Sequence, residues 1–159
     1  MKQEQLTPEK LEKTIIFDLN GSEYGLPVNF VESIETSLPI TRVPHEKSYI
    51  KGVINLRGKI IPVIDLRTRL EEEQEHSNEE DQIIITRIDE TQVGLIIDSA
   101  NDVLDIPVSL LENPPETIGT VKKEYIHSMV HLDNRLIVLL DIYKLLNLEE
   151  IKSQEADDQ

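Results

Sequence analysis

YIKGVINLRGKIIPVIDLRTRL, residues 49–70, is the most informative segment of this chain. It holds two apolar runs rich in β-branched residues, separated by the polar turn Arg57-Gly58-Lys59. Runs of this length and composition, bounded by Gly and Pro, are typical of strands, and the pair predicts a β-hairpin. Asp65 suits a helix N-cap, and Leu66 and Leu70 are spaced as on one face of a short helix.

The same pattern returns in YIHSMVHLDNRLIVLLDIYKLL, residues 125–146, without a gap. The offset between the copies is 76 (125 minus 49), and the residues identical in both are Tyr49/Tyr125, Ile50/Ile126, Leu56/Leu132, Ile61/Ile137, Asp65/Asp141 and Leu70/Leu146. A second repeat has an offset of 69 (94 minus 25), because Gly25-Leu26 matches Gly94-Leu95. The Asn20-Gly21 pair between the strands of the earlier copy is a strong hairpin signal. An internal repeat of this kind predicts two equivalent structural units.

Each unit has about five short strands with tight turns. Such strands favour closed or nearly closed barrels, because closure removes exposed strand edges. The sequence therefore predicts an all-β fold of two tandem five-stranded barrels with short helices, one of them C-terminal. The predicted division is a first barrel over 14–70, an acidic linker over 71–81 and a second barrel over 82–148, with polar tails at 1–13 and 149–159.

The composition narrows the class of protein. A chain of 159 residues, of which 38% are hydrophobic, can bury a core, and without cysteine it forms no disulfide or thiolate metal site. The net charge is −15, and residues 71–81 carry seven acidic side chains without Lys or Arg. We expect no nucleic-acid partner, because phosphates need a basic surface. No apolar run reaches the length of a membrane span, and the first residues do not resemble a signal peptide, which favours the cytoplasm.

Catalysis has little support in the sequence. The four histidines are His45, His76, His127 and His131. The last two lie on a predicted strand, where four residues span about 13 Å, too far for one metal ion. No phosphate loop or nucleophile motif is present, so we expect neither an enzyme nor a cofactor.

The two copies differ most at their turns. The second copy has Asp133-Asn134, which is ordinary turn chemistry, whereas the first has Arg57-Gly58. The turn itself does not require an arginine. Two interpretations follow: Arg57 is a solvated residue that pairs with a neighbouring acid, or it belongs to a binding surface.

At these residues the chain resembles a known family. IKGVINLRGKIIPVIDLR (50–67) is similar to the signature segment of the chemotaxis coupling proteins of the CheW family, and the similarity extends from about residue 14 to 148. ITRVP (40–44), VGLIIDSANDVL (93–104) and RLIVLLDIYKLL (135–146) also match that family.

The resemblance implies two SH3-like barrels and a non-catalytic cytoplasmic adaptor. Its partners would be the signalling tips of methyl-accepting chemoreceptors and a CheA-type histidine kinase. The chain would be a monomer in solution that joins membrane-associated receptor arrays without inserting into the membrane. Two alternatives remain: the same role in a chemosensory pathway that does not control flagella, and a small-ligand-binding barrel protein.

The resemblance also implies two binding surfaces. A receptor helix would lie between the barrels, and the candidate residues for that surface are Gly52, Asn55, Arg57 and Gly58 on the first barrel and Ile83 and Val103 on the second. The kinase would bind the first barrel alone. Its candidate residues are Val31, Ser33 and Ile40, where Ser33 replaces an acidic residue found in some members of the family.

Overall fold

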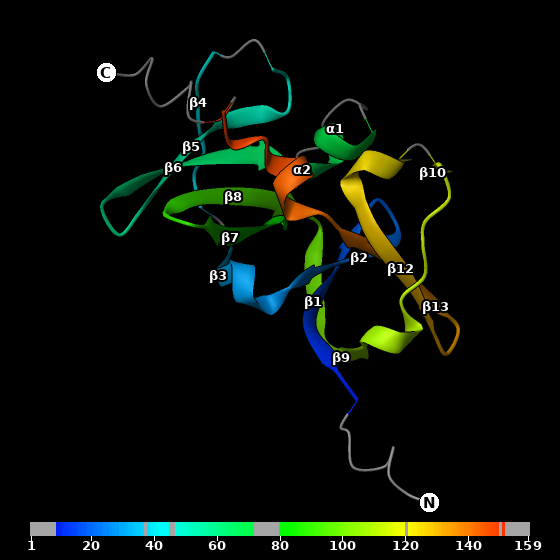
Figure 1. Cartoon of the computed structure of the whole chain (residues 1–159). Helices are drawn as coiled ribbons and strands as arrows, with labels where there is room; N and C mark the ends of the chain where they lie inside the picture. The colour runs from blue at the N-terminus through cyan, green and yellow to red at the C-terminus, as the bar shows by residue number, and fades with distance from the viewer. Residues whose placement is uncertain are drawn as a thin grey trace, which may run out of the picture.

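The computed structural model describes residues 9–36, 38–44, 47–71, 80–119, 121–149 and 151 (Figure 1). The strands are β1 (Leu11–Leu19), β2 (Ser22–Pro27), β3 (Val31–Thr36), β4 (Thr41–Arg42), β5 (Ile50–Leu56), β6 (Lys59–Asp65), β7 (Gln82–Ile88), β8 (Thr91–Ile97), β9 (Ser99–Pro107), β10 (Thr117–Ile118), β11 (Val121–Lys122), β12 (Ile126–Leu132) and β13 (Arg135–Leu140). The helices are α1 (Leu66–Glu71), α2 (Ile142–Leu146) and the 3-10 helices η2 (Val28–Phe30), η3 (Val108–Leu110) and η4 (Lys123–Tyr125).

The predicted hairpins and helix caps are confirmed. β5 and β6 pair antiparallel around the Arg57-Gly58 turn, and β12 and β13 pair in the same way. Asp65 Oδ1 accepts a 3.0 Å hydrogen bond from the Arg67 backbone N–H at the start of α1. Asp141 Oδ1 accepts bonds of 3.1 and 3.2 Å from the backbone N–H groups of Tyr143 and Lys144 in α2. Both copies of the repeat therefore form a hairpin followed by a capped helix.

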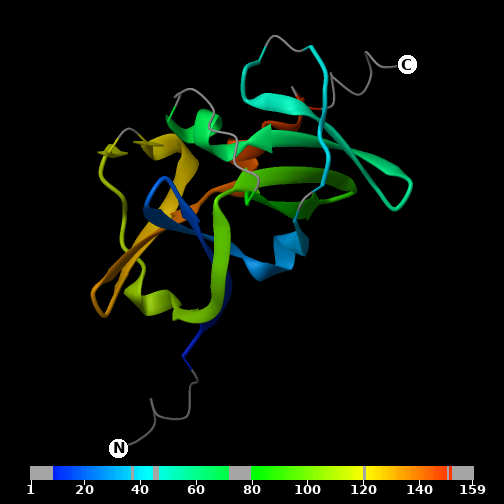
Figure 2. The ribbon, with the colours of Figure 1, turned by 180° about the vertical axis from the view of Figure 1, so that it is seen from behind.

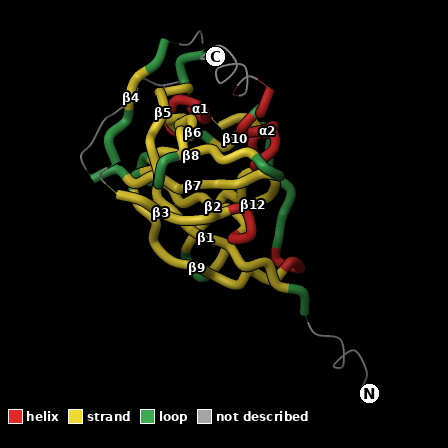
Figure 3. Tube along the Cα trace, turned by 90° about the vertical axis from the view of Figure 1, so that its left-hand side faces the viewer, coloured by secondary structure: helices red, strands yellow, loops and turns green. Residues whose placement is uncertain are grey.

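Two large sheets confirm the all-β, two-barrel fold, with β10 and β11 as a separate small pair. Sheet A has the order β12-β13-β2-β1-β9, and sheet B has the order β3-β7-β8-β6-β5-β4. Figure 2 shows the molecule from behind, and Figure 3 shows the strands of both sheets in side view.

The strands are not shared between the sheets as the predicted division at 14–70 and 82–148 requires. The β1–β2 hairpin joins sheet A with the later strands, and the β7–β8 hairpin joins sheet B with the earlier ones. The two units have thus exchanged their first hairpins. The hydrophobic pattern could not reveal this, because equivalent hairpins carry the same pattern and fit either sheet.

The exchange is symmetric, as the parallel strand contacts show. β6 pairs with β8 through Val63 and Gly94, and β13 pairs with β2 through Leu139 and Gly25. Leu139 corresponds to Val63 at the offset of 76, and Gly94 corresponds to Gly25 at the offset of 69, so both sequence offsets meet in one repeated contact. The two sheets therefore share the same strand pairing between equivalent strands.

Short pairings bring each sheet towards closure at equivalent places. In sheet B, β4 pairs Thr41 with Val53 of β5. In sheet A, Glu112 and Met129 exchange two backbone hydrogen bonds of 2.8 and 3.0 Å. Met129 corresponds to Val53 at the offset of 76, so the closing contact also repeats.

Three hydrophobic clusters account for the continuous apolar runs. One lies within sheet B and includes Ile83 and Ile85, and another lies within sheet A and includes Ile16. The third and largest, the junction core, includes Ile15 and Ile84. Neighbouring residues on β1 and β7 thus face opposite clusters, which explains why these strands are apolar on both sides.

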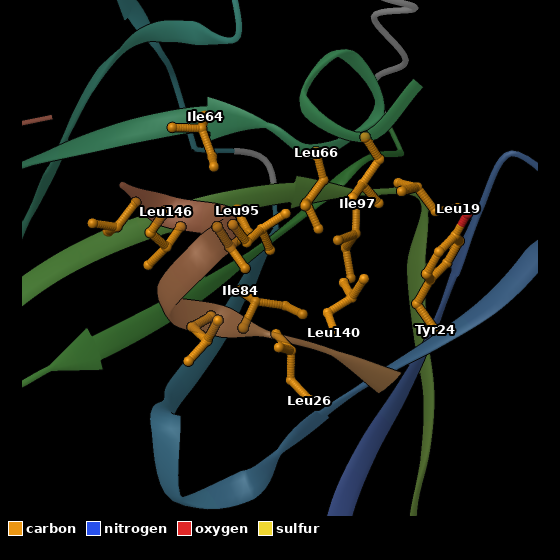
Figure 4. Packing of buried hydrophobic residues seen from close by; sticks show 14 of the residues in the cluster. Leu19, Tyr24, Leu26, Ile64, Leu66, Ile84, Leu95, Ile97, Leu140 and Leu146 are labelled. Carbon is orange, nitrogen blue, oxygen red and sulfur yellow. The ribbon is translucent and has the colours of Figure 1, made fainter. Parts of the chain in front are cut away.

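The junction core is where the two sheets meet (Figure 4). Sheet A, sheet B and both helices contribute to the labelled side chains, namely Leu19, Tyr24, Leu26, Leu140, Ile64, Ile84, Leu95, Ile97, Leu66 and Leu146. Burial of each large side chain stabilises the fold by about 1.5–3 kcal/mol. The two sheets are consequently one packed body.

Arg69 of α1 links the two copies of the repeat. Its guanidinium carbon lies 4.2 Å from the ring centre of Tyr49 and 4.9 Å from that of Tyr125, the residues that open the two copies. Its Nε donates a 2.7 Å hydrogen bond to the carbonyl oxygen of Leu145 at the end of α2. One arginine thus joins α1, α2 and both tyrosines.

The ends of the predicted units also differ from the structure. β1 begins at Leu11, inside the predicted N-terminal tail, because it pairs with β9 as far as Pro107. Ile151, inside the predicted C-terminal tail, is buried in the junction core. Most of the predicted acidic linker, residues 72–79, lies outside the described residues, as do residues 1–8 and 152–159 of the tails.

Candidate functional site

The turn between β5 and β6 carries an exposed arginine. Arg57 has φ 52° and Gly58 has φ 85°. Asn55 supports this turn, because its Oδ1 accepts a 3.1 Å hydrogen bond from the Gly58 backbone N–H. The Arg57 side chain is 75% exposed, and its Nη2 lies 3.9 Å from Glu35 Oε2. An exposed ion pair at that distance contributes little stability, so the guanidinium is accessible to a partner.

Arg57 is unusual in this backbone conformation. The other non-glycine residues with positive φ in the described ranges are Asn20, Asp89, Asp133 and Asn147. Asn and Asp tolerate the left-handed region because their short side chains bond locally, whereas arginine has no such advantage. Backbone geometry therefore does not account for the arginine.

The two glycines of the predicted receptor surface, Gly52 and Gly58, are each required by the fold, for different reasons. A Cβ on Gly52 would meet the carbonyl oxygen of Thr41 at 2.1 Å, so this position needs glycine for the close approach of β4. Gly58 has open space around it but needs its positive φ. Gly52 is therefore explained by packing and Gly58 by the turn.

Ile83 does not lie where the resemblance implied. It is on β7 in sheet B, the same sheet as the Arg57 turn, and only 4% of its surface is exposed. The expectation that Ile83 presents itself from a second barrel is wrong, because the β7–β8 hairpin has crossed to the earlier strands. Val103, on the edge strand β9 of sheet A, is 52% exposed and available for contact.

Ile34 is an exposed apolar residue that sequence reasoning missed. It lies on β3, the edge strand of sheet B, and is 37% exposed. Ile34 pairs with Ile84, just as Val103 pairs with Ile15, and each partner belongs to the junction core. Val103 corresponds to Ile34 at the offset of 69. Because Val103 was a candidate for the receptor surface, this repeat could have identified Ile34 as a second candidate. The two edge strands thus present matching apolar residues next to the junction.

Of the predicted kinase residues, Val31 and Ser33 lie on β3, whereas Ile40 directly precedes β4. Val31 is half-buried against the junction core, and Ser33 donates a 2.8 Å hydrogen bond to Glu35 Oε2. Ile40 is half-buried against the sheet B cluster. The structure thus places Val31 and Ser33 in sheet B and Ile40 just outside it, where part of the Ile40 side chain packs against the sheet B cluster.

Charged and polar residues join β3 to its neighbouring strands. Glu32 of β3 accepts hydrogen bonds from Arg87 of β7 and from Gln92 of β8, the latter of 2.6 Å. These bonds, those of Arg87 first, lower the pKa of the Glu32 carboxyl. The Glu32 carboxylate is therefore charged at neutral pH and links β3 to β7 and β8.

Arg67 forms a buried ionic cluster that the sequence did not reveal. Its guanidinium lies 2.8 Å from Asp81 Oδ2, 3.0 Å from Asp98 Oδ1 and 3.4 Å from Asp65 Oδ1. Burial alone would lower the pKa of Arg67, but the hydrogen bond to Asp81 and the three negative charges together raise it. The cluster ties α1 to the start of β7 and the end of β8.

Two further properties concern possible chemistry and membrane contact. Within the ranges described, no group of three or more His, Cys, Asp or Glu side chains is placed to hold a metal ion. His127 Nδ1 is 2.9 Å from Ser128 Oγ, whereas His131 Nδ1 is 3.2 Å from Glu112 Oε2, so the two histidines have separate neighbours.

None of the helices in the described part of the chain combines the length and apolar character needed to cross a bilayer.

Comparisons with known proteins agree with this architecture. The family model of the CheW-like domain matches residues 13–150. The chain is 41% identical over 146 residues to the chemotaxis protein CheW of Bacillus subtilis, covering 92% of this chain and 94% of that protein. It is 34% identical over 140 residues to the chemotaxis protein CheW of Klebsiella aerogenes, covering 88% and 84%.

A solved structure has the same fold. The crystal structure of the scaffolding protein TtCheW from Thermoanaerobacter tengcongensis superposes with a TM-score of 0.77 at 32% sequence identity, covering 86% of this chain and 92% of that one. The model match, the curated relatives and the shared two-sheet fold all extend over most of the chain. The chain therefore belongs to the CheW-like family of chemotaxis scaffolding proteins.

Proposed function

We propose that this protein is a non-catalytic adaptor that couples the signalling tips of methyl-accepting chemoreceptors to a CheA-type histidine kinase. It would act in the cytoplasm, at membrane-associated receptor arrays. Such an adaptor needs no reactive site. It needs separate surfaces on a rigid body, and the weak contacts of each surface gain avidity in a repeated array.

The observation that carries the proposal is Arg57. A cation that is 75% exposed, loosely paired and held in a conformation that arginine rarely adopts is better explained by a partner than by the fold. Receptor binding would use Asn55 and Arg57 together with the apolar residues Ile34 and Val103 near the junction. A helical partner suits such a combination, because one helix face can contact apolar and charged residues at once.

The kinase surface would lie on sheet B around Val31 and Ser33. Ser33 is joined to Glu35 by a hydrogen bond, so an acidic group is still present on this face. Glu35 also lies beside Arg57, which puts the two proposed surfaces close together on one sheet.

Charge reversal at the turn tests the receptor surface. We expect Arg57→Glu to weaken receptor binding at least tenfold in co-sedimentation with receptor fragments, since a like charge in a desolvated contact is costly. Kinase binding should change far less. Circular dichroism should show an unchanged melting temperature, because exposed turn substitutions rarely alter stability by more than about 0.5 kcal/mol.

The equivalent turn of sheet A supplies a matched control. Asp133→Lys reverses an exposed charge at the position that corresponds to Arg57 and should leave receptor binding unchanged. Unaltered receptor binding by a folded Arg57→Glu variant would refute the proposed role of the turn.

A further inference from the structure

A cavity of about 260 Å³ lies beside α2, where the starts of β1 and β12 meet the end of β13. Its walls include the aromatic rings of Phe30 and Tyr143, which meet edge to face with their centres 5.8 Å apart. Glu12, Asp141 and His127 also line it. The cavity is thus partly aromatic and partly acidic.

The internal repeat shows what fills the equivalent place in the first copy. At the offset of 76, Tyr143 corresponds to Arg67 and Asp141 corresponds to Asp65, and at the offset of 69 Glu12 corresponds to Asp81. In the first copy the Arg67 guanidinium is buried between Asp65 and Asp81, at 3.4 and 2.8 Å from their carboxylate oxygens.

The second copy keeps two of the acids and lacks the guanidinium. Tyr143 stands in place of the arginine and is 59% exposed. Among the described residues, neither Glu12 nor Asp141 forms an ion pair with a lysine or arginine. Asp98, the third acid that contacts Arg67, has no acidic counterpart, since Asn29 occupies the corresponding position. The cavity is consequently the counterpart of a site that binds a guanidinium within this same chain.

We propose that this cavity binds an arginine side chain presented by a partner protein. Two carboxylates accept charge-assisted hydrogen bonds from a planar guanidinium, and aromatic rings favour its stacking. The chain already uses that second contact, because Arg69 lies over the rings of Tyr49 and Tyr125.

Size and charge favour a protein-borne side chain over a free amino acid. The volume of about 260 Å³ is below the roughly 300–1,000 Å³ of pockets that hold drug-sized ligands. Among the described residues that line it there is no lysine or arginine to pair with the α-carboxylate of free arginine. A side chain whose backbone stays outside the cavity meets both conditions.

Titration with a blocked arginine tests the site directly. N-acetyl-arginine methylamide should cause saturable amide shifts at Phe30, Ile142 and Tyr143 in NMR spectra of the full chain, with a Kd on the order of 1 mM. The neutral isostere N-acetyl-citrulline methylamide should bind at least tenfold more weakly. Glu12→Gln should weaken arginine binding about tenfold, because it removes one charged acceptor.

A second variant fills the cavity from within. Tyr143→Arg should place a guanidinium between Glu12 and Asp141, as Arg67 lies between its own acids. It should therefore abolish binding of the blocked arginine and melt at a higher temperature than Tyr143→Gln.

The proposal is overturned by any of three results. The first is the absence of saturable shifts, or equal binding of the arginine and citrulline probes. The second is tighter binding of free arginine than of the blocked form, which would indicate a metabolite site. The third is a Tyr143→Arg variant that melts below Tyr143→Gln or still binds the probe.

Discussion

At the scale of single residues, Arg67 shows why one buried charge is indispensable. Three carboxylates surround its guanidinium, and two of them, on Asp81 and Asp98, lie next to β7 and β8 rather than on α1. Removing the arginine takes away the cation that the three carboxylates share. The loss of one member of a buried ion cluster costs more than its net contribution, because the desolvated partners remain.

We therefore expect Arg67→Met to lower the free energy of unfolding by about 3 kcal/mol in urea denaturation. Arg135→Met is the matched control. Arg135 donates hydrogen bonds of 2.9 and 2.8 Å to Glu23 but is partly exposed, so its loss should cost about 1 kcal/mol or less. Equal losses of unfolding free energy in the two variants would contradict the larger contribution expected of the buried Arg67 cluster.

At the scale of elements, Gly52 governs how β4 attaches to β5. The two-residue strand β4 lies against β5 through the pairs Thr41–Val53 and Arg42–Gly52. Any side chain at position 52 would push the Thr41 carbonyl away. The distance at which the two backbones pair cannot be kept in that case.

Gly52→Ala should therefore detach β4 and expose the Ile40 side of the sheet B cluster. The expected result is a loss of about 2 kcal/mol or more and faster amide hydrogen exchange at Val53. Gly58→Ala is the comparison, because its Cβ meets nothing within 4 Å and only the positive φ is penalised, by about 1 kcal/mol. Slow exchange at Val53 in a folded Gly52→Ala variant would show that β4 tolerates the side chain.

At the scale of the whole molecule, the exchanged hairpins make the two halves interdependent. Sheet A needs β1 and β2 from the first half, and sheet B needs β7 and β8 from the second. The junction core also takes side chains from both. Neither half can complete a sheet or cover its apolar strands alone.

Fragments 1–74 and 75–159 should accordingly be unfolded or aggregated when separate. Mixed after dilution from denaturant, they should form a complex with native-like circular dichroism, because each supplies the hairpin that the other lacks. A cooperative thermal transition of either fragment alone would contradict the interleaved fold.

The sequence by itself determined the local structure and the family. Tight turns at Asn20-Gly21 and Arg57-Gly58 and the caps Asp65 and Asp141 depend on residues close together in the chain, and the two repeat offsets are visible when the sequence is compared with itself. Those features specify hairpins, capped helices and an all-β fold, because backbone conformation and strand periodicity are read from neighbouring residues.

Only the tertiary structure decided which sheet each hairpin joins. β1 and β7 are apolar on both faces, so their pattern states that both sides are buried but not against which strands. The burial of Ile83, the pairing of Ile34 with Ile84 and the contacts of Arg67 with Asp81 and Asp98 all depend on that choice. Each of these contacts joins residues that are distant in the chain, and equivalent repeats offer two partners of nearly equal pattern, so the packing of the complete molecule selects between them.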